Sequence, residues 1–171
     1  NVMNLLRNWY MIQTAAVNET SRDVKFDDEV MGQLIRFVSA HEVGHTIGLQ
    51  HNMGSSSAYP VDSLRSPFFT SSHGVAPSIM DYARFNYVAQ PGDGVTNFYP
   101  MVGTYDIWAI KWGYTYFDGE STKSEQKLLN EWIKSHSGDY EYWFGYSNGI
   151  DPRSQTESIG DDNMMASFYG I

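Results

Sequence analysis

The stretch Ala40–Met53, AHEVGHTIGLQHNM, places three of the chain's five histidines within eleven residues. Residues four positions apart lie one above the other on an α-helix, so His41 and His45 can direct their rings toward one point. Gly48 can adopt the positive φ that ends a helix, and the resulting turn would bring His51 back to the same point. Three neutral imidazoles leave a zinc ion one open tetrahedral position, which is typical of a catalytic site.

Glu42 directly follows the first of these histidines. One helical position is a rotation of about 100°, which keeps its carboxylate out of the coordination shell but close to a metal-bound water. A carboxylate there can act as a general base and pass the proton to a leaving amine. The competing interpretation is a solvated or core-packed histidine pair, because HExxH alone has many chance matches. The longer pattern HExxHxxGxxH has a chance probability of roughly 10⁻⁵ in a chain of this composition, which favours the zinc site.

Composition limits the classes of protein that need to be considered. A chain of 171 residues that is 42% hydrophobic and 15% aromatic can bury the core of one domain. Its net charge of −9 would repel a phosphate backbone, which argues against nucleic acid as a partner. The absence of cysteine leaves histidine and carboxylates as metal ligands. No apolar run approaches the 18 or so residues of a membrane span.

The start of the chain suggests a fragment. The sequence starts with Asn1 and has no signal-peptide pattern. We therefore expect residues 1–171 to form a single domain taken from a larger multidomain protein.

Hydrophobic spacing and capping residues predict a mainly α-helical fold with long irregular loops. Residues 54–81 are rich in Ser, Pro and Gly and show no sustained period, which predicts one long ordered loop. Helices are expected at residues 1–17, from Asp27 through the histidines, and at residues 161–169. A short, apolar, buried helix is expected from Thr104 to Gly113. A further helix should begin with a capping box of Thr122 and Glu125 and end at Gly138.

A second motif, further along the chain, accompanies the zinc motif. HEVGHTIGLQH resembles the extended zinc motif of the metzincin metallopeptidases, and SIMDY at Ser78–Tyr82 resembles their methionine-containing turn, the Met-turn. The resemblance implies that Met80, 29 residues after His51, lies beneath the zinc ligands without binding the metal. It also implies that Tyr82 binds zinc or stabilises the tetrahedral oxyanion, as in astacin-like and serralysin-like metzincins. A buried aromatic ring under the site is the competing interpretation for Tyr82.

Other segments extend the resemblance over most of the chain. YDIWAIKWGY, residues 105–114, resembles the helix that follows the Met-turn in serralysins and matrix metalloproteinases. Residues 41–67, 78–94 and 151–162 more closely resemble large bacterial zinc-dependent metallopeptidases that carry a met-zincin domain. This resemblance implies an extracytoplasmic location in a bacterium: periplasm, cell envelope or secreted.

The sequence departs from a complete metzincin at its start. Metzincins carry an upper subdomain with a twisted sheet, and only forty residues precede His41 here. We expect the active-site helix plus the lower, C-terminal subdomain of a metzincin-like α+β protease fold, with the upper sheet largely absent. Apolar surface left by the missing subdomain predicts self-association.

Motif and resemblance together predict a zinc metallopeptidase with one catalytic Zn²⁺. The expected reaction is hydrolysis of a protein or peptide substrate by Glu42-assisted attack of zinc-bound water. Two alternatives stay open: a catalytically weak module, derived from a metzincin, that binds a peptide or another partner, and a zinc amidohydrolase that acts on a non-peptide amide. The intact general base argues against the binding module.

Several other residues could be functional or structural. We expect His73 to be a solvent-exposed loop residue rather than a substrate contact, and His136 to be a structural residue at a helix C-terminus. The carboxylates of residues 151–162 fit capping and solvation better than a calcium loop. A substrate pocket and core packing are equally compatible with the aromatic group Tyr59, Phe68 and Phe69.

Overall fold

The computed structural model describes residues 2–119, 121–147 and 149–171, and these residues form helices and loops without a β-strand. The elements are, in order, α1 (Val2–Thr14), η1 (Glu19–Arg22), α2 (Asp28–Thr46), η2 (Ser55–Ala58), α3 (Val61–Leu64), α4 (Pro67–His73), α5 (Thr104–Tyr114), α6 (Thr122–Ser135), η3 (Tyr140–Tyr142) and α7 (Asn163–Gly170). The mainly helical prediction with long loops is therefore confirmed for the described residues.

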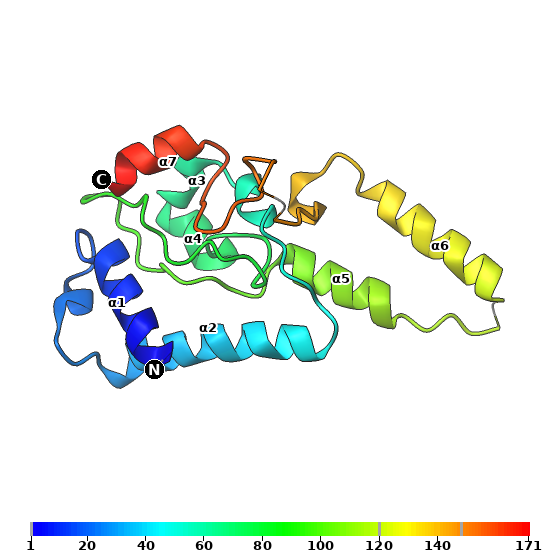
Figure 1. Cartoon of the computed structure of the whole chain (residues 1–171), viewed down its shortest axis with the longest axis horizontal. Helices are drawn as coiled ribbons and strands as arrows, with labels where there is room; N and C mark the ends of the chain where they lie inside the picture. The colour runs from blue at the N-terminus through cyan, green and yellow to red at the C-terminus, as the bar shows by residue number, and fades with distance from the viewer. Residues whose placement is uncertain (1, 120, 148) are drawn as a thin grey trace.

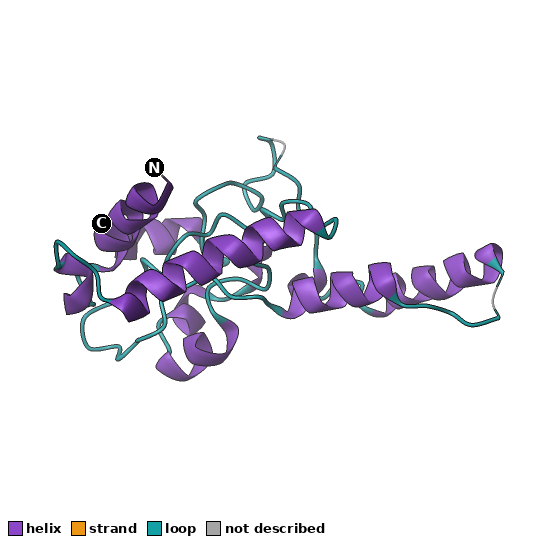
Figure 2. Ribbon diagram, turned by 90° about the horizontal axis from the view of Figure 1, so that it is seen from below, coloured by secondary structure: helices purple, strands orange, loops and turns teal. Residues whose placement is uncertain are grey.

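The helices are distributed unevenly along the molecule. Helices α1 and α2 lie at one end, α3, α4 and α7 lie near them, and α5 and α6 extend toward the other end (Figure 1). Seen from below, α2 crosses the body of the molecule, and α6 projects well beyond it (Figure 2). His41 and His45 therefore lie on the helix that crosses the body of the molecule.

Helix α2 forms where the sequence predicts it, and it carries the first hydrophobic core. The Asp27 side chain accepts a hydrogen bond of 2.8 Å from the Val30 backbone N–H and so caps the helix. Leu34 and Phe37 follow at helical spacing and are buried against α1 and Phe85. The same face continues to His41, which is 5% exposed. Burial of this apolar stripe fixes the direction in which the first histidine points.

A second core lies under residues 54–81, where a single irregular loop was predicted. That prediction is wrong, because the segment contains η2, α3 and α4. Ser66 caps α4 with its side chain, and Gly74 ends this helix at φ 66°. These short helices bury Val61 and Leu64 against Ile159 and α7. Elements of four to seven residues are too short to show a hydrophobic period in the sequence.

The two projecting helices also differ from the prediction. Helix α5 runs one residue past Gly113, and it is not buried along its length, since Ile107 is 51% exposed. Helix α6 is capped by Ser121 and Ser124 rather than by Thr122 and Glu125. It has no buried residue, because the described chain covers only part of its surface.

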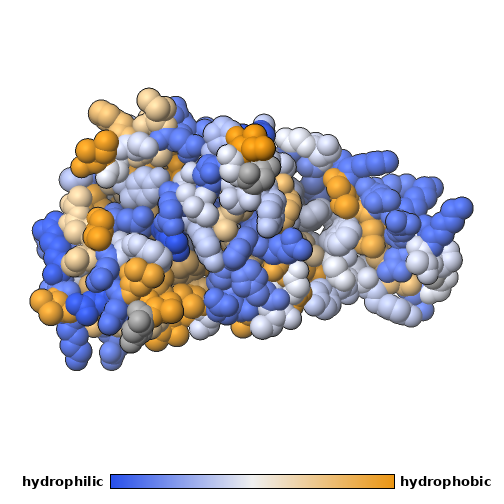
Figure 3. Space-filling view, viewed as in Figure 1, coloured by the Kyte–Doolittle hydropathy of each residue, from blue (hydrophilic) through white to orange (hydrophobic). Residues whose placement is uncertain are grey.

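Apolar side chains are exposed at the opposite end of the molecule. Figure 3 shows hydrophobic residues gathered near α1 and mostly hydrophilic residues over α6. The exposed apolar residues of α1 and α2 include Val2, Leu5, Ile12, Ile35 and Val43. Self-association through this surface stays a prediction. No described helix has the length and apolar character that crossing a membrane requires.

Candidate metal centre

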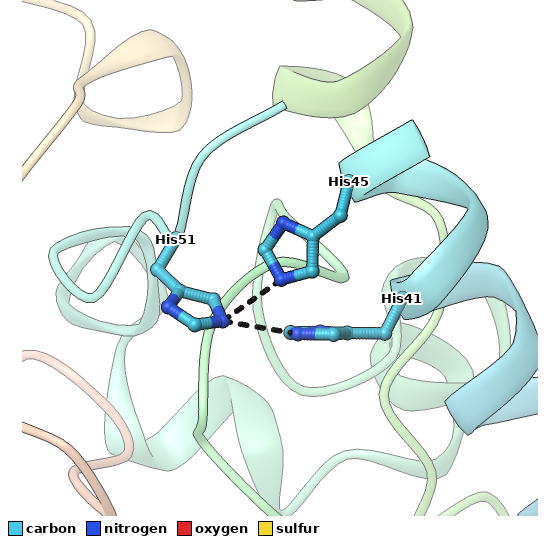
Figure 4. Close-up of side chains that lie close together, drawn as sticks. All are labelled: His41, His45 and His51. Atoms are coloured by element: carbon cyan, nitrogen blue, oxygen red, sulfur yellow. Dashed lines mark hydrogen bonds between the residues drawn. The ribbon is translucent and has the colours of Figure 1, made fainter. Parts of the chain in front are cut away.

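Three histidine rings converge beside the C-terminal part of α2. Helix α2 provides His41 and His45, and the chain then turns at Gly48, with φ 95°, so that His51 faces them (Figure 4). The Nε2 atom of His51 lies 3.2 Å from Nε2 of His41 and 3.0 Å from Nε2 of His45. The geometry predicted from the spacing of the three histidines is thus present in the structure.

These distances fit one tetrahedral zinc ion. Zinc–nitrogen bonds of about 2.0–2.1 Å at the tetrahedral angle separate two ligand nitrogens by about 3.3 Å. The two Nε2 separations at His51 are close to that value, and the ligand atoms of all three histidines lie within 4.8 Å of one another. The donor set is also suitable, since zinc accepts three imidazoles and keeps a fourth position open.

Backbone carbonyls hold the far side of two rings. Nδ1 of His41 lies 2.8 Å from the Ile79 carbonyl oxygen, and Nδ1 of His45 lies 3.0 Å from the Leu49 carbonyl oxygen. A carbonyl can only accept, so each Nδ1 carries the proton and each Nε2 presents a lone pair to the metal. Burial lowers the pKa of the His41 imidazole. Burial, followed by the nearby His41, likewise lowers the pKa of His51 and favours the neutral form that binds zinc.

The Met-turn packs directly beneath this centre. Met80 is fully buried, and a Cβ atom added to Gly44 would clash with its sulfur. The Met80 carbonyl accepts a 3.2 Å hydrogen bond from the Asn52 backbone N–H, which ties the turn to the residue after His51. Sequence reasoning missed Gly44, although its place between the two helical histidines is a usable signal: no larger side chain leaves room for the methionine.

A buried carboxylate from α5 fixes the shape of the same turn. Asp106 accepts hydrogen bonds from Ser78 Oγ at 2.6 Å, from the Ile79 N–H at 2.7 Å and from the Gly103 N–H at 2.9 Å. Burial raises the pKa of Asp106, although these donors act in the opposite direction. The Ile79 carbonyl in turn holds His41. Sequence reasoning missed this role, because an aspartate in the first turn of a helix is already explained by the helix dipole.

A second buried carboxylate joins the turn to the segment after His51. Asp81 Oδ2 accepts hydrogen bonds from the Ser56 N–H at 2.7 Å and from Ser55 Oγ at 3.1 Å. Burial raises the pKa of Asp81 to about 7. Two links to the Met-turn, one through Asn52 and one through η2, therefore follow His51 in the chain and hold the segment that carries it.

Comparison with known proteins agrees with this geometry. A family model described as Met-zincin matches residues 23–171, which is all of the chain except its first part. The chain belongs to the met-zincin family. Searches of the curated proteins and of the solved structures found no match.

In this met-zincin domain, Tyr82 lies beside the metal centre. Its ring centroid is 4.6 Å from that of His51 and 5.3 Å from that of His41, and the Arg84 guanidinium lies 4.9 Å from its centroid. The Tyr82 carbonyl accepts a 3.1 Å hydrogen bond from the Glu157 N–H, which fixes the backbone at this position. The structure brings the Tyr82 ring beside His41 and His51.

Glu42 is exposed, whereas His41 is buried. Its negative charge raises the pKa of His41 and of His51, although burial has the larger and opposite effect at both rings. An exposed carboxylate on the ligand helix is accessible to water and to a substrate. The helical rotation inferred from the sequence is therefore compatible with the structure.

The remaining candidate residues have structural environments. His73 belongs to α4 rather than to a loop: its ring stacks on Phe69 at 4.4 Å, and its Nδ1 lies 3.1 Å from the Phe69 carbonyl oxygen. Tyr59 is buried against Phe69 in the second core, whereas Phe68 is 84% exposed. These aromatic residues therefore do not form one pocket wall.

The polar residues near the C-terminus are used mainly as caps and in ion pairs. His136 is the C-cap of α6 and stacks on Tyr142 at 3.9 Å. Asp162 caps α7, and Asp161 accepts a 3.0 Å hydrogen bond from the Val61 N–H. Asp151 pairs with Arg153 at 2.7 Å. Capping and pairing thus account for these carboxylates without a calcium ion.

Proposed function

We propose that this met-zincin domain is a zinc-dependent metalloendopeptidase. The observation that carries the proposal is the convergence of three Nε2 atoms at spacings that suit one zinc ion, with the Glu42 carboxylate exposed on the same helix. Three imidazoles plus a nearby carboxylate are the groups needed for metal-assisted hydrolysis of an amide bond.

Each residue has a defined task in this reaction. His41, His45 and His51 hold the metal, which when bound polarises the scissile carbonyl and lowers the pKa of a water molecule toward about 7. Glu42 takes a proton from the attacking water and passes it to the leaving amine. Tyr82 donates a hydrogen bond from its hydroxyl to the developing oxyanion. The carbonyls of Ile79 and Leu49 keep two of the rings oriented throughout.

Metal analysis tests the first part of the proposal. Protein purified without chelators should contain about one zinc per chain, because the three nitrogens define one site. His45→Ala should lower the zinc affinity at least 100-fold, since two imidazoles remain. His73→Ala, which changes a histidine of α4, is the matched control and should bind zinc as the wild type does. Wild-type protein without zinc, or full zinc content in His45→Ala, would refute the metal site.

Peptide cleavage tests the second part. A peptide library should reveal hydrolysis by the zinc-loaded protein, and Glu42→Gln should reduce kcat at least 100-fold while zinc stays bound. Glu131→Gln, an exposed glutamate of α6, is the control and should leave kcat unchanged. Peptide binding without hydrolysis would instead indicate a binding module, and cleavage of non-peptide amides alone would indicate an amidohydrolase.

We also propose the extracytoplasmic location implied by the family resemblance. It predicts that the parent protein appears in the periplasmic, envelope or secreted fraction of the cell. Recovery in the cytoplasmic fraction alone would contradict it.

A further inference from the structure

Two residues near the metal centre have an unusual backbone conformation. Arg84 has φ 64° and Glu157 has φ 68°, and among the described residues no others except glycines have a positive φ. Residues that carry a Cβ atom rarely adopt this region, and the conformation persists only where surrounding contacts hold it. The two residues lie 73 positions apart in the chain, and their side chains pair with each other. Contacts between them therefore help to hold both conformations.

The ion pair between these residues is bidentate. Arg84 Nε donates to Glu157 Oε2 at 2.6 Å, and Arg84 Nη2 donates to Glu157 Oε1. The Arg84 guanidinium also lies 3.8 Å from the centroid of the Trp9 ring of α1. A planar guanidinium that makes two parallel hydrogen bonds and lies over an indole ring has a defined orientation. The Arg84 side chain is 13% exposed, so this orientation is also protected from solvent.

The same guanidinium contacts Tyr82. Its carbon atom Cζ lies 4.9 Å from the centroid of the Tyr82 ring, within the distance of about 6 Å at which a cation is attracted to an aromatic face. The Tyr82 ring centroid lies 4.6 Å from that of His51 and 5.3 Å from that of His41. Contacts therefore lead from the ion pair, through the Tyr82 ring, to two of the three histidines.

Glu157 holds the backbone of Tyr82 as well. Its N–H donates a 3.1 Å hydrogen bond to the Tyr82 carbonyl oxygen, while its carboxylate pairs with Arg84. One residue thus holds the main chain of Tyr82 directly and its ring through the guanidinium. The chain is also held after Arg84, since the Phe85 N–H donates to the side chain of Gln13 on α1 at 3.2 Å. Contacts on both sides of Arg84 therefore fix its place in the loop.

We propose that Arg84, held by Glu157, is a positioning residue that keeps the Tyr82 ring beside His51. A hydroxyl stabilises an oxyanion only when its ring is correctly oriented, because the hydrogen bond requires a distance of about 2.7–3.1 Å. A tyrosine ring turns about two side-chain bonds, so holding it in advance removes a cost from the reaction. The inference rests on the proposed peptidase function, and it adds a residue that acts on the reaction through Tyr82.

The position of the ring can be measured without catalysis. In protein with ¹³C-labelled tyrosine and histidine rings, the Tyr82 signals are those that Tyr82→Phe removes. A nuclear Overhauser effect should connect them with the ring protons of His51 and His41. Arg84→Met removes the charge but keeps a long side chain, and should weaken this effect about threefold. Arg84→Lys keeps the charge and should restore part of it.

Kinetics separate positioning from a purely structural role. Because Arg84 acts through Tyr82, Arg84→Met should lower kcat for a cleaved peptide about tenfold with little change in KM. The same substitution should have almost no further effect in the Tyr82→Phe background, where the hydroxyl that it positions is absent. A general loss of folded protein would instead lower kcat equally in both backgrounds.

Arg7 provides a matched control. Its guanidinium lies 5.5 Å from the centroid of the Phe26 ring, so Arg7→Met makes the same change at another cation–aromatic contact. It should leave the Tyr82 signals and kcat as in the wild type. Glu157→Gln removes the charged partner of Arg84, and should act in the same direction as Arg84→Met but less strongly. Zinc content and circular dichroism check that each variant is folded.

Three outcomes would overturn the proposal: an Overhauser effect that is absent in the wild type or unchanged in Arg84→Met, an equal weakening by Arg7→Met, or equal losses of kcat in the wild-type and Tyr82→Phe backgrounds. A weakened effect that Arg84→Lys restores supports it. Glu157→Gln carries the same test should Arg84→Met not fold. If no peptide is cleaved but the Overhauser effect depends on Arg84, the peptidase proposal fails while the positioning of Tyr82 stands, so the two failures can be told apart.

Discussion

The metal centre and helix α6 are built in opposite ways. Around the metal centre, the rings of His41 and His45 are held by backbone carbonyls, and buried carboxylates fix the turn below them. Helix α6 has no buried residue among those described, and a hydrogen bond from Trp112 Nε1 to the Leu129 carbonyl oxygen joins it to α5. The first region depends on tertiary contacts, whereas the second depends mainly on its own sequence.

This difference has a functional meaning. A metal site must present its ligands within a few tenths of an ångström before the ion arrives, so it needs rigid support on every side. Helix α6 carries none of the three histidines, so its position is not subject to this requirement. The sequence shows the same difference. Apolar residues of α2 recur at helical spacing up to His41, whereas α6 has a narrow apolar face on an otherwise charged and polar helix.

The largest effect is expected from the same leucine truncation made in the two regions. Leu34 is fully buried in α2, so Leu34→Ala should lower the free energy of unfolding by about 2–5 kcal/mol. Leu128 of α6 is 39% exposed, and Leu128→Ala should cost less than about 1 kcal/mol. Urea unfolding of the metal-free protein measures both values. Equal losses would mean that α6 belongs to the same cooperative core.

The carboxylate beneath the Met-turn should have the next largest effect. Asp106→Ala leaves three donors without their acceptor, and two of them, Ser78 Oγ and the Ile79 N–H, are buried. We therefore expect a loss of about 2–3 kcal/mol and weaker zinc binding. Asp118→Ala removes an exposed carboxylate between α5 and α6 and should change the stability by less than about 0.5 kcal/mol. Thermal unfolding combined with zinc titration tests this pair. Unchanged zinc affinity in Asp106→Ala would show that the Met-turn does not need this anchor.

The two regions were not equally predictable from the sequence. The convergence of His41, His45 and His51 followed from helical spacing and one glycine, since these constraints are local. The carboxylates that hold the Met-turn could not be predicted in this way. Asp106, for example, accepts a hydrogen bond from the N–H of Ile79, which lies 27 residues away in the chain. An interaction across that distance leaves no periodic signal in the sequence.

The errors about secondary structure have physical reasons as well. Helices α3 and α4 were missed because they are shorter than the window that reveals a hydrophobic period. Helix α5 was expected to be buried because its sequence is apolar, but the side chain of Ile107 faces solvent. Apolar composition shows that a surface is suited to burial, whereas the rest of the chain decides whether a partner covers it.

Two glycines of the same helix test how closely the centre is packed. A Cβ at Gly44 would clash with the Met80 sulfur, so Gly44→Ala should destabilise the protein by about 1–3 kcal/mol. A Cβ at Gly32 would meet nothing within 4 Å, so Gly32→Ala should stabilise it by about 0.5–1 kcal/mol through helix propensity. Chemical denaturation of both variants gives the sign of each effect. A stabilising Gly44→Ala substitution would contradict the tight packing of Met80.

The final expected effect is the pH dependence that Asp81 contributes. Burial raises its pKa in the folded protein from 3.8 to about 7, so between these values the folded chain keeps a proton that the unfolded chain has released. Its contribution to stability is therefore complete below about pH 4 and is lost as the pH rises through about 7. Asp81→Asn, which is neutral at every pH, should remove this loss. Its stability relative to the wild type should therefore be greater at pH 8 than at pH 4 by up to about 4 kcal/mol, since each pKa unit corresponds to about 1.4 kcal/mol.

The comparison between wild type and Asp81→Asn isolates this carboxyl group. In the metal-free protein, His41 and His51 have lowered pKa values, so both chains lose stability as the pH falls below about 6.5, and this common contribution cancels. The measurement is the free energy of unfolding in urea at several pH values between 4 and 8. Parallel curves would mean that Asp81 is ionised in the folded protein at pH 4, and that the donors of Ser55 and Ser56 outweigh its burial.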